Sequence, residues 1–266
     1  MPAINPERLK QETAELATHF SEPARFVYAL EGLFERYADR VRRPGQIGAP
    51  APLLPTYKVA TPVMRQIMLT LTPLAADDPQ AALALADALW DSPSLETRQI
   101  AIQLLGLQPT EDPQPILERI TAWATPHAEE NILDELFEKG LASLLREHPA
   151  QLLDLSREWT NNRQVEYQVL GMKMLLQMVQ NPAFDNFPQV FRMLLPRLID
   201  SLPVLRGHLV AMLRALGTRS PQETAHFLHQ VLIVTENPSI AWITRQVMDL
   251  FSDETQDRLK ETIRNR

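Results

Sequence analysis

Two histidines stand three residues apart in the last third of the chain, a spacing that places both imidazole rings on one face of a helix. They are His226 and His229, in the segment TAHFLHQ, and such a pair could share a metal ion. No further histidine or acidic residue stands at a spacing typical of a metal site. The pattern therefore favours an ordinary pair on a helix surface, and we predict no metal site.

The acidic pairs in the middle of the chain could also carry chemistry, because two carboxylates can divide the roles of general acid and base. Glu129-Glu130 and Asp134-Glu135 look like charged helix positions, however, and no spacing marks them as a hydrolytic pair. The sequence contains no glycine-rich nucleotide loop, no P-loop, no nucleophile elbow and no H-E-x-x-H motif. It contains no cysteine, which excludes disulfides, zinc ribbons and thiol nucleophiles. We expect no cofactor.

Arginine provides the remaining chemistry, which is the binding of phosphate. Residues 61–160 carry 6 basic and 16 acidic residues, and this net charge of −10 makes the middle third a poor surface for a polyanion. Residues 161–266 have a net charge of +2, and the stretch 192–219 has five arginines against one acidic residue. This stretch could hold a local basic patch, formed by Arg192, Arg197, Arg206, Arg214 and Arg219.

Prolines mark where the helices that carry these residues begin. The chain has 22 prolines and only 8 glycines, and many prolines directly follow a residue that can cap a helix. Ser220 with Glu223 also predicts a capping box, and His148-Pro149 and Leu202-Pro203 mark further starts. We expect a helix to start at each of the capping pairs: Asn5-Pro6, Thr61-Pro62, Asp78-Pro79, Ser92-Pro93, Asp112-Pro113, Ser220-Pro221 and Asn237-Pro238.

Segments with a helical apolar period lie between these starts. The clearest covers residues 163–179, where Val165, Val169 and Met172 share one stripe and further apolar residues predict burial on most sides. We count about thirteen to fifteen helices and no strand alternation. The sequence therefore predicts an all-α fold, an α-solenoid of about six to seven antiparallel helical pairs in a single domain, 1–266. A globular helical bundle is the alternative, although so many similar short helices do not fit one compact core.

The segment 40–60, RVRRPGQIGAPAPLLPTYKVA, breaks the helical pattern. Its prolines predict a long connection or an exposed arm. Arg40, Arg42 and Arg43 could reach a phosphate from it, and a solvated loop is the simpler interpretation. No apolar run approaches the roughly 20 residues that a membrane span needs, and the N-terminus has no apolar signal core. We expect a cytoplasmic protein that does not enter a membrane.

Three segments between residues 57 and 180 share a pattern with one known family. In YKVATPVMRQIM, Pro62 and Arg65 stand where a G-x-x-x-P-x-x-R helix entry has its proline and arginine, although this segment lacks the glycine. In the third segment, a run of the form D…L-x-x-HP-x-L…W falls on Asp134, His148-Pro149 and Trp159. The second segment, LWDSPSLETRQIAIQLL, matches at Leu89, Trp90, Glu96, Ile100-Ala101 and Leu104-Leu105.

These segments resemble the AlkD-like DNA alkylation-repair family, which is built from HEAT-like helical repeats. We expect Trp90, Glu96 and Arg98 to lock one helical pair onto the next, and the resemblance implies that this pair belongs to a DNA-repair scaffold with a HEAT-like α-solenoid fold. Active members of the family are glycosylases that hold duplex DNA on a basic concave face and excise positively charged alkylpurines.

The resemblance places Asp134 at the catalytic aspartate of the family, where a carboxylate stabilises the developing oxocarbenium sugar or activates water. On a helix expected over 129–146, Asp134 lies at the edge of an apolar stripe. Basic residues that could touch phosphate, besides the five arginines of 192–219, are Arg42, Arg43, Lys58, Arg65, Arg98 and Lys173.

The chain departs from the family at two positions that matter for excision. Glu130 stands where the family has a tryptophan four residues before the aspartate, and Trp123 is eleven residues ahead of Asp134. Val169 stands where the family has an arginine. These changes remove an aromatic contact with the lesion and an anchor for the DNA backbone.

Two kinds of function remain open. The first is a repair-family protein that binds duplex DNA, with Asp134 as the candidate catalyst of excision. The second is a non-catalytic helical-repeat scaffold that binds another protein on its concave face. A binder of DNA structure without excision, using the stretch 192–219, lies between them. In each case we expect a monomer.

Overall fold

The computed structural model describes residues 4–39 and 54–265, and these residues are almost entirely helical. They form fifteen α-helices, one π-helix and two 3-10 helices. The only extended pairing among them is an isolated antiparallel bridge between Ala38 and Val59. The prediction of an all-α helical-repeat fold is confirmed. Arg42 and Arg43, with most of the Pro-rich segment 40–60, lie outside the described residues.

The helices divide into two compact units, residues 1–147 and 148–266. The single domain predicted over 1–266 stays a prediction. The N-terminal unit contains α1 (Pro6–Ala17), α2 (Pro23–Tyr37), α3 (Thr61–Asp77), α4 (Pro79–Asp91), α5 (Leu95–Gly106), α6 (Gln114–Trp123), α7 (Glu130–Glu135), the π-helix η1 (Leu136–Gly140) and α8 (Ala142–Glu147). The C-terminal unit contains α9 (Pro149–Thr160), α10 (Val165–Gln180), α11 (Phe187–Asp200), η2 (Pro203–Leu205), α12 (Arg206–Arg219), α13 (Pro221–Val234), α14 (Pro238–Arg245), η3 (Met248–Leu250) and α15 (Asp253–Arg264).

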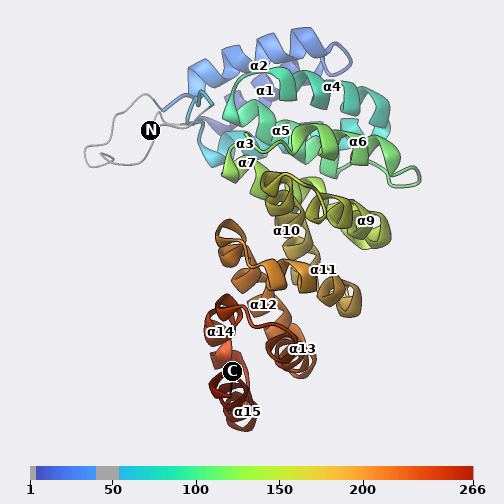
Figure 1. Cartoon of the computed structure of the whole chain (residues 1–266). Helices are drawn as coiled ribbons and strands as arrows, with labels where there is room; N and C mark the ends of the chain where they lie inside the picture. The colour runs from blue at the N-terminus through green and yellow to red at the C-terminus, as the bar shows by residue number, and fades with distance from the viewer. Residues whose placement is uncertain (1–3, 40–53, 266) are drawn as a thin grey trace. The chain divides into compact units, whose positions relative to one another are not determined.

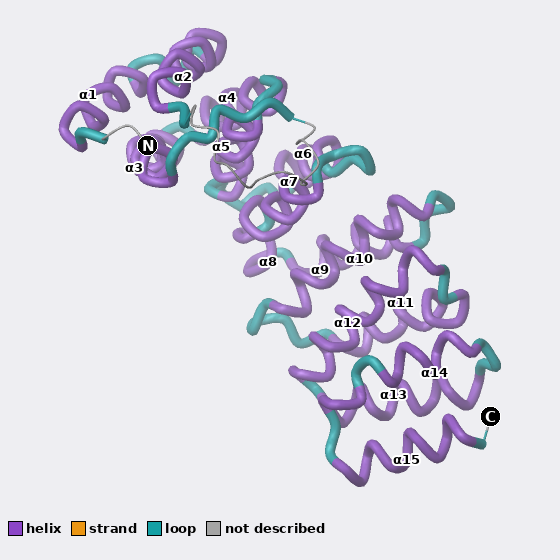
Figure 2. The backbone as a smooth tube through the Cα atoms, turned by 90° about the vertical axis from the view of Figure 1, so that its left-hand side faces the viewer, coloured by secondary structure: helices purple, strands orange, loops and turns teal. Residues whose placement is uncertain are grey.

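Within each unit, alternate helices stack in two layers (Figures 1 and 2). In the N-terminal unit α1, α3, α5 and α7 pack in succession, and α2 packs on α4 in the other layer. In the C-terminal unit α10, α12 and α14 form one layer, and α11, α13 and α15 form the other. A helix of one pair therefore contacts the equivalent helix of the next pair, which is the packing logic of helical repeats.

Leucine, isoleucine and methionine fill the interior between these layers. In α10, which was expected to be buried on most sides, Leu170, Met174 and Met178 are almost fully buried. Gly171 on the same helix allows α9 to approach closely, because a Cβ there would lie 2.8 Å from the backbone nitrogen of Thr160. None of the helices in the described ranges is long and apolar enough to cross a bilayer.

Most of the predicted helix starts are confirmed. The side chains of Asn5, Asp78 and Asn237 accept hydrogen bonds from backbone N–H groups in the first turns of α1, α4 and α14. The helices α9 and α13 begin at the predicted prolines, Pro149 and Pro221. At Ser220, the expected capping box is replaced by a bond between the two side chains: the hydroxyl donates to the Glu223 carboxylate at 3.0 Å.

The start predicted at Ser92-Pro93 is wrong, and α5 begins two residues later. Ser94 is the capping residue, and its hydroxyl accepts from the Thr97 N–H at 3.2 Å. The Ser92 hydroxyl instead donates to Glu31 of α2 at 3.0 Å. This tertiary partner engages Ser92, so the nearer serine caps the helix.

The single helix expected over 129–146 is also wrong, because a π-turn and a break divide it into α7, η1 and α8. The reason lies in the contact with α5, where a Cβ on Gly106 would stand 2.2 Å from the Lys139 carbonyl oxygen. The extra residue of the π-turn lets Leu136, Phe137 and Leu141 all remain fully buried although the backbone is displaced.

Candidate nucleic-acid interface

A groove of about 650 Å³ runs along the layer of the N-terminal unit that contains α3, α5 and α7. The loop before α3 forms one end of it, and η1 contributes from the other side. Its residues are both polar and apolar: Thr56, Lys58, Val59, Thr61, Met64, Arg65, Met68, Leu69, Thr72, Leu95, Glu96, Gln99, Gln103, Glu135 and Lys139.

Three cations line this groove, and two of them were predicted from the sequence. Lys58 and Arg65 are exposed, and neither forms an ion pair with any residue that the structure describes. Lys139 donates to Glu135 at 2.6 Å, and the same carboxylate accepts from the Gln99 side chain at 2.9 Å. The groove thus presents two cations whose charges are not neutralised within the described part of the chain.

The loop that carries Lys58 is fixed by Glu96, the second residue of α5. The Glu96 side chain is only 4% exposed and accepts four hydrogen bonds from the loop. The donors are the Thr56 hydroxyl at 2.8 Å and the N–H groups of Tyr57 at 3.2 Å, Lys58 at 2.7 Å and Val59 at 3.4 Å. Sequence reasoning gave Glu96 a role in locking helical pairs, but it did not predict this loop contact.

Tyr57 on this loop gives the N-terminal unit a pH dependence. Burial raises the pKa of its phenol above the ordinary 10.0, and the negative charges of Glu31, Glu35 and Glu96 raise the pKa further. A raised pKa means that the fold favours the neutral phenol, so this contribution to stability is complete below pH 10.0 and is lost as the pH rises through the folded-state pKa.

We therefore expect a Tyr57→Phe variant to lose less stability than the wild type as the pH rises above 10.0. Thermal melts across this range, followed by circular dichroism, measure the difference. Tyr28→Phe is the matched control, because Tyr28 is 80% exposed on α2. An alkaline stability loss that is identical in the wild type and Tyr57→Phe contradicts the prediction.

Arg98, another predicted phosphate contact, is engaged within the unit. Its guanidinium lies 4.8 Å from the centre of the Trp90 ring, and its Nε donates to the Trp90 carbonyl at 3.3 Å. The Trp90 ring stacks on Trp123 with ring centres 4.4 Å apart and planes 7° apart. These contacts join α4, α5 and α6, which agrees with the predicted role of Trp90 and Arg98 in holding neighbouring helices together.

Asp134, the candidate catalytic residue, is exposed on α7. Its neighbour Glu135 lines the groove, whereas Leu133 on the other side is buried in the core. Trp123 is 5% exposed in its stack with Trp90, so its ring is not available to contact an extruded base in this conformation. Glu130 begins α7, one turn before Asp134.

Three arginines of the predicted C-terminal patch hold helices of their own unit together. Arg206 donates to the Ser201 carbonyl at 3.3 Å and to the Ser239 hydroxyl at 2.9 Å. Arg219 donates to the carbonyls of residues 179, 181 and 182 at 2.7–3.0 Å.

Arg214 forms a two-bond pair with Asp249 at 2.9 and 2.8 Å. The hydrogen bonds of this pair raise the pKa of Arg214 and lower that of Asp249. Guanidiniums that are already bonded in this way have fewer donors left for a phosphate.

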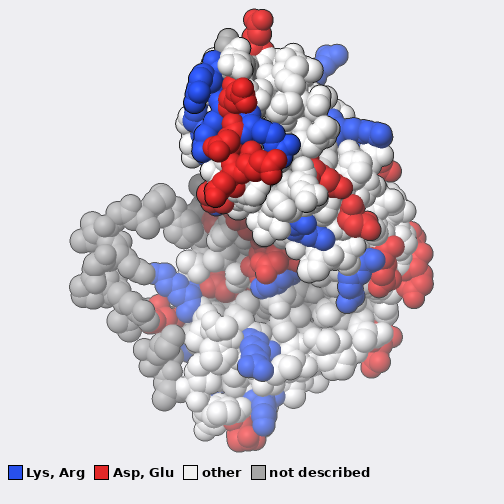
Figure 3. Space-filling view, turned by 90° about the horizontal axis from the view of Figure 1, so that it is seen from below, with Lys and Arg blue, Asp and Glu red and all other residues white. Residues whose placement is uncertain are grey.

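The remaining predicted cations are spread over the C-terminal unit. Arg192 is exposed on α11 and forms no ion pair with a described residue. Arg197 on the same helix is half-buried, and its Nε has no hydrogen-bond partner among the residues that the structure describes. Lys173 is half-buried on α10. Figure 3 shows acidic and basic side chains interspersed on the face seen from below, rather than one continuous basic surface among the residues that it colours.

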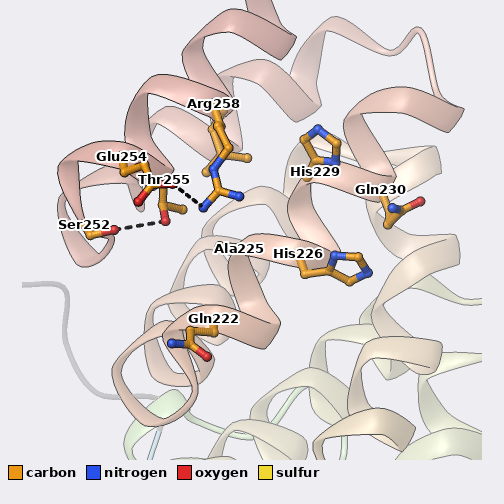
Figure 4. Close-up of a pocket in the computed structure, with 10 residues that line it drawn as sticks. Gln222, Ala225, His226, His229, Gln230, Ser252, Glu254, Thr255 and Arg258 are labelled. Atoms are coloured by element: carbon orange, nitrogen blue, oxygen red, sulfur yellow. Dashed lines mark hydrogen bonds and ion pairs between the residues drawn. The ribbon is translucent and has the colours of Figure 1, made fainter.

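His226 and His229 line a cleft of about 630 Å³ between α13 and α15 (Figure 4). Arg258 lies across the cleft and pairs with Glu254 at 3.8 Å, and the Ser252 hydroxyl donates to the Thr255 hydroxyl at 3.0 Å. In the two described ranges, no three histidine or acidic side chains gather where they could hold a metal ion.

Sequence reasoning missed two parts of the groove, the Glu96 contact with the loop and the position of Lys139. One signal for the first was present, because Glu96 is the only acidic residue between Asp91 and Glu111. A lone carboxylate in an apolar helical segment needs hydrogen-bond donors when it is buried. No comparable signal marks Lys139, because the π-turn that places it depends on the contact with Gly106.

Comparison with known proteins agrees with the resemblance found in the sequence. A family described as DNA alkylation repair enzyme matches residues 36–248. No curated protein and no solved structure gives a significant match. The family match includes α3 to α14 and with them all the residues that line the groove. The chain therefore belongs to the DNA alkylation repair enzyme family, and its function is related to DNA repair.

Proposed function

We propose that this protein binds duplex DNA, and that Lys58 and Arg65 contact backbone phosphates along the groove of the N-terminal unit. The observation that supports the proposal is the pair of exposed cations on one groove, with no ion pair to any described residue. Phosphate contacts by lysine and arginine supply most of the sequence-independent affinity for DNA.

The net charge of −10 over residues 61–160 opposes such binding, but the acidic residues of the groove are locally engaged. Glu96 is buried and accepts four hydrogen bonds, and Glu135 is paired with Lys139. Neither carboxylate is left as an isolated charge facing the groove. The local balance therefore favours an anion more than the charge of the whole segment suggests.

Duplex binding measured by fluorescence anisotropy at about 50 and about 200 mM salt tests the proposal. Two phosphate contacts predict a slope of about −1.8 in log K against log salt concentration, which weakens binding roughly 10-fold over this range. We expect a duplex with a cationic alkylpurine to bind with affinity similar to the undamaged duplex, because Trp123 is buried and Glu130 replaces the family tryptophan. The absence of binding at the lower salt concentration, or an affinity that salt does not change, would overturn the proposal.

Excision of a cationic alkylpurine is the second candidate activity, and the exposed Asp134 supports it. A carboxylate beside the sugar can stabilise the positive charge that develops as the glycosidic bond breaks. The replacements at Glu130 and Val169 argue for slow excision, since they remove groups that the family resemblance assigns to lesion and backbone contact. The family match does not favour the alternative of a protein scaffold without DNA binding.

We expect Asp134→Asn to lower any excision rate by about 100-fold or more, because the amide cannot carry the negative charge. Single-turnover release of the alkylated base from a labelled duplex measures this rate. The matched control is Glu138→Gln, which removes another exposed carboxylate one turn later. Equal rates for the wild type and Asp134→Asn would exclude Asp134 as the catalyst.

A further inference from the structure

Lys58 has a backbone conformation that lysine rarely adopts. Its φ angle is 55°, in the left-handed region, and Ser201 is the only other non-glycine residue with positive φ in the described ranges. The Cβ atom makes this region unfavourable for residues other than glycine and, to a smaller extent, asparagine. A lysine remains in it only when the surrounding structure holds it there.

The Glu96 carboxylate keeps Lys58 in this conformation. The N–H groups of Tyr57, Lys58 and Val59 all point to this one side chain, and the Lys58 bond is the shortest of the three at 2.7 Å. Successive backbone N–H groups converge in this way where the chain turns through a left-handed residue, and the resulting concavity binds an anion. Here the anion is the buried carboxylate of Glu96, so the charge of Glu96 and the conformation of Lys58 depend on each other.

The ends of the loop are also fixed. The Leu95 N–H donates to the Pro55 carbonyl at 3.0 Å, and Val59 forms the isolated bridge with Ala38. The Thr56 hydroxyl accepts from the Lys58 N–H at 3.1 Å as well as donating to Glu96. The backbone of Lys58 is thus held from several sides, while its side chain is exposed and lines the groove beside Arg65.

We propose that Glu96 is a positioning residue, which holds Lys58 in the left-handed conformation so that its ammonium group meets a DNA phosphate at the groove. This inference rests on the proposed function. Its physical basis is that glycine would satisfy the same backbone bonds with less strain, so the lysine side chain lowers stability at this position. The Lys58 side chain forms no ion pair with any described residue. In this proposal its partner is a DNA phosphate in the groove.

The first test measures the effect of Lys58→Gly on stability and, separately, on duplex binding. Relief of the left-handed strain should raise the melting temperature by about 2 °C. The same substitution should weaken duplex binding and make the slope of log K against log salt shallower by about 0.9, the value for one phosphate contact. Lys58→Asn, which also tolerates the left-handed region, should flatten the slope equally. Lys10→Ala on α1 is the charge control and should leave the slope unchanged.

The second test places Glu96→Gln in both the wild-type and the Lys58→Gly backgrounds. The amide keeps the size of the side chain but faces backbone donors with an NH₂ group, so it should release the loop. We expect Glu96→Gln to flatten the salt slope by about 0.9 in the wild type and to leave it unchanged in Lys58→Gly, where the contact is already absent. Its melting temperature should fall in both backgrounds.

The outcomes distinguish the inference from the function on which it rests. If the wild type does not bind duplex DNA, the proposed function fails and the inference fails with it. If the wild type binds and Lys58→Gly keeps the full salt slope, the inference alone is overturned. If Glu96→Gln flattens the slope equally in both backgrounds, Glu96 acts through the general fold of the unit and its role as a positioning residue is excluded.

Discussion

Replacement of Trp123 by alanine is expected to destabilise the N-terminal unit by about 3–5 kcal/mol. The Trp123 ring is 5% exposed and stacks on Trp90 at 4.4 Å, so its loss removes a large buried surface and leaves a cavity between α4 and α6. Urea denaturation followed by circular dichroism measures the change, because the substitution also removes a fluorophore. We expect the two compact units to unfold in separate transitions, with the shift only in the transition of the N-terminal unit.

The matched control for this prediction is Trp242→Ala. Trp242 is 46% exposed on α14, so its removal should cost well under half as much. A double-mutant cycle with Trp90→Ala should give a coupling energy of about 0.5–1.5 kcal/mol for the stacked pair. Equal costs for Trp123→Ala and Trp242→Ala would contradict the assignment of the tryptophan stack as a core of the N-terminal unit.

Reversal of both groove cations, in the variant Lys58→Glu/Arg65→Glu, should weaken duplex binding by on the order of 10-fold or more at low salt. Both phosphate contacts are lost, and two negative charges are placed where the DNA backbone would lie. The salt slope should become shallower by about 1.8. Anisotropy titrations at several salt concentrations provide both values.

The control for charge reversal changes the net charge by the same amount outside the groove. Lys10 on α1 and Arg25 on α2 are exposed and do not line the groove, so Lys10→Glu/Arg25→Glu alters the overall charge equally. We expect this variant to keep most of the affinity and the full salt slope. If the two double variants weaken binding equally, the groove is not the interface and long-range repulsion accounts for the effect.

The local signals in the sequence were most reliable where a helix start depends on one capping residue. Asn5, Asp78 and Asn237 each cap a helix through their own side chains, as their position before a proline predicts. The same reasoning failed at Ser92, because its hydroxyl bonds to Glu31, a residue 61 positions earlier in the chain. The capping propensity of serine does not take account of a partner so far away in the sequence.

The candidate site shows the same difference between what local sequence predicts and what contacts between distant residues decide. The sequence and the family resemblance identified Lys58 and Arg65, and the structure brings both to one groove. Nothing in the sequence distinguishes the five arginines of 192–219 from one another, but in the structure Arg206, Arg214 and Arg219 form hydrogen bonds within their own unit. Charge composition counts cations, but it does not show which of them already have partners.

By itself, the sequence determined the helical class, most helix starts and the family, because apolar periodicity, capping and motif spacing depend on residues close together in the chain. Only the tertiary structure decided where the π-turn falls, which cations are free of ion pairs in the described ranges, and what Glu96 binds. Each of these depends on contacts between distant segments: Gly106 with Lys139, Arg214 with Asp249, and α5 with the loop before α3. Tertiary packing decides which hydrogen-bond donors lie next to a buried carboxylate, and the local sequence does not specify them.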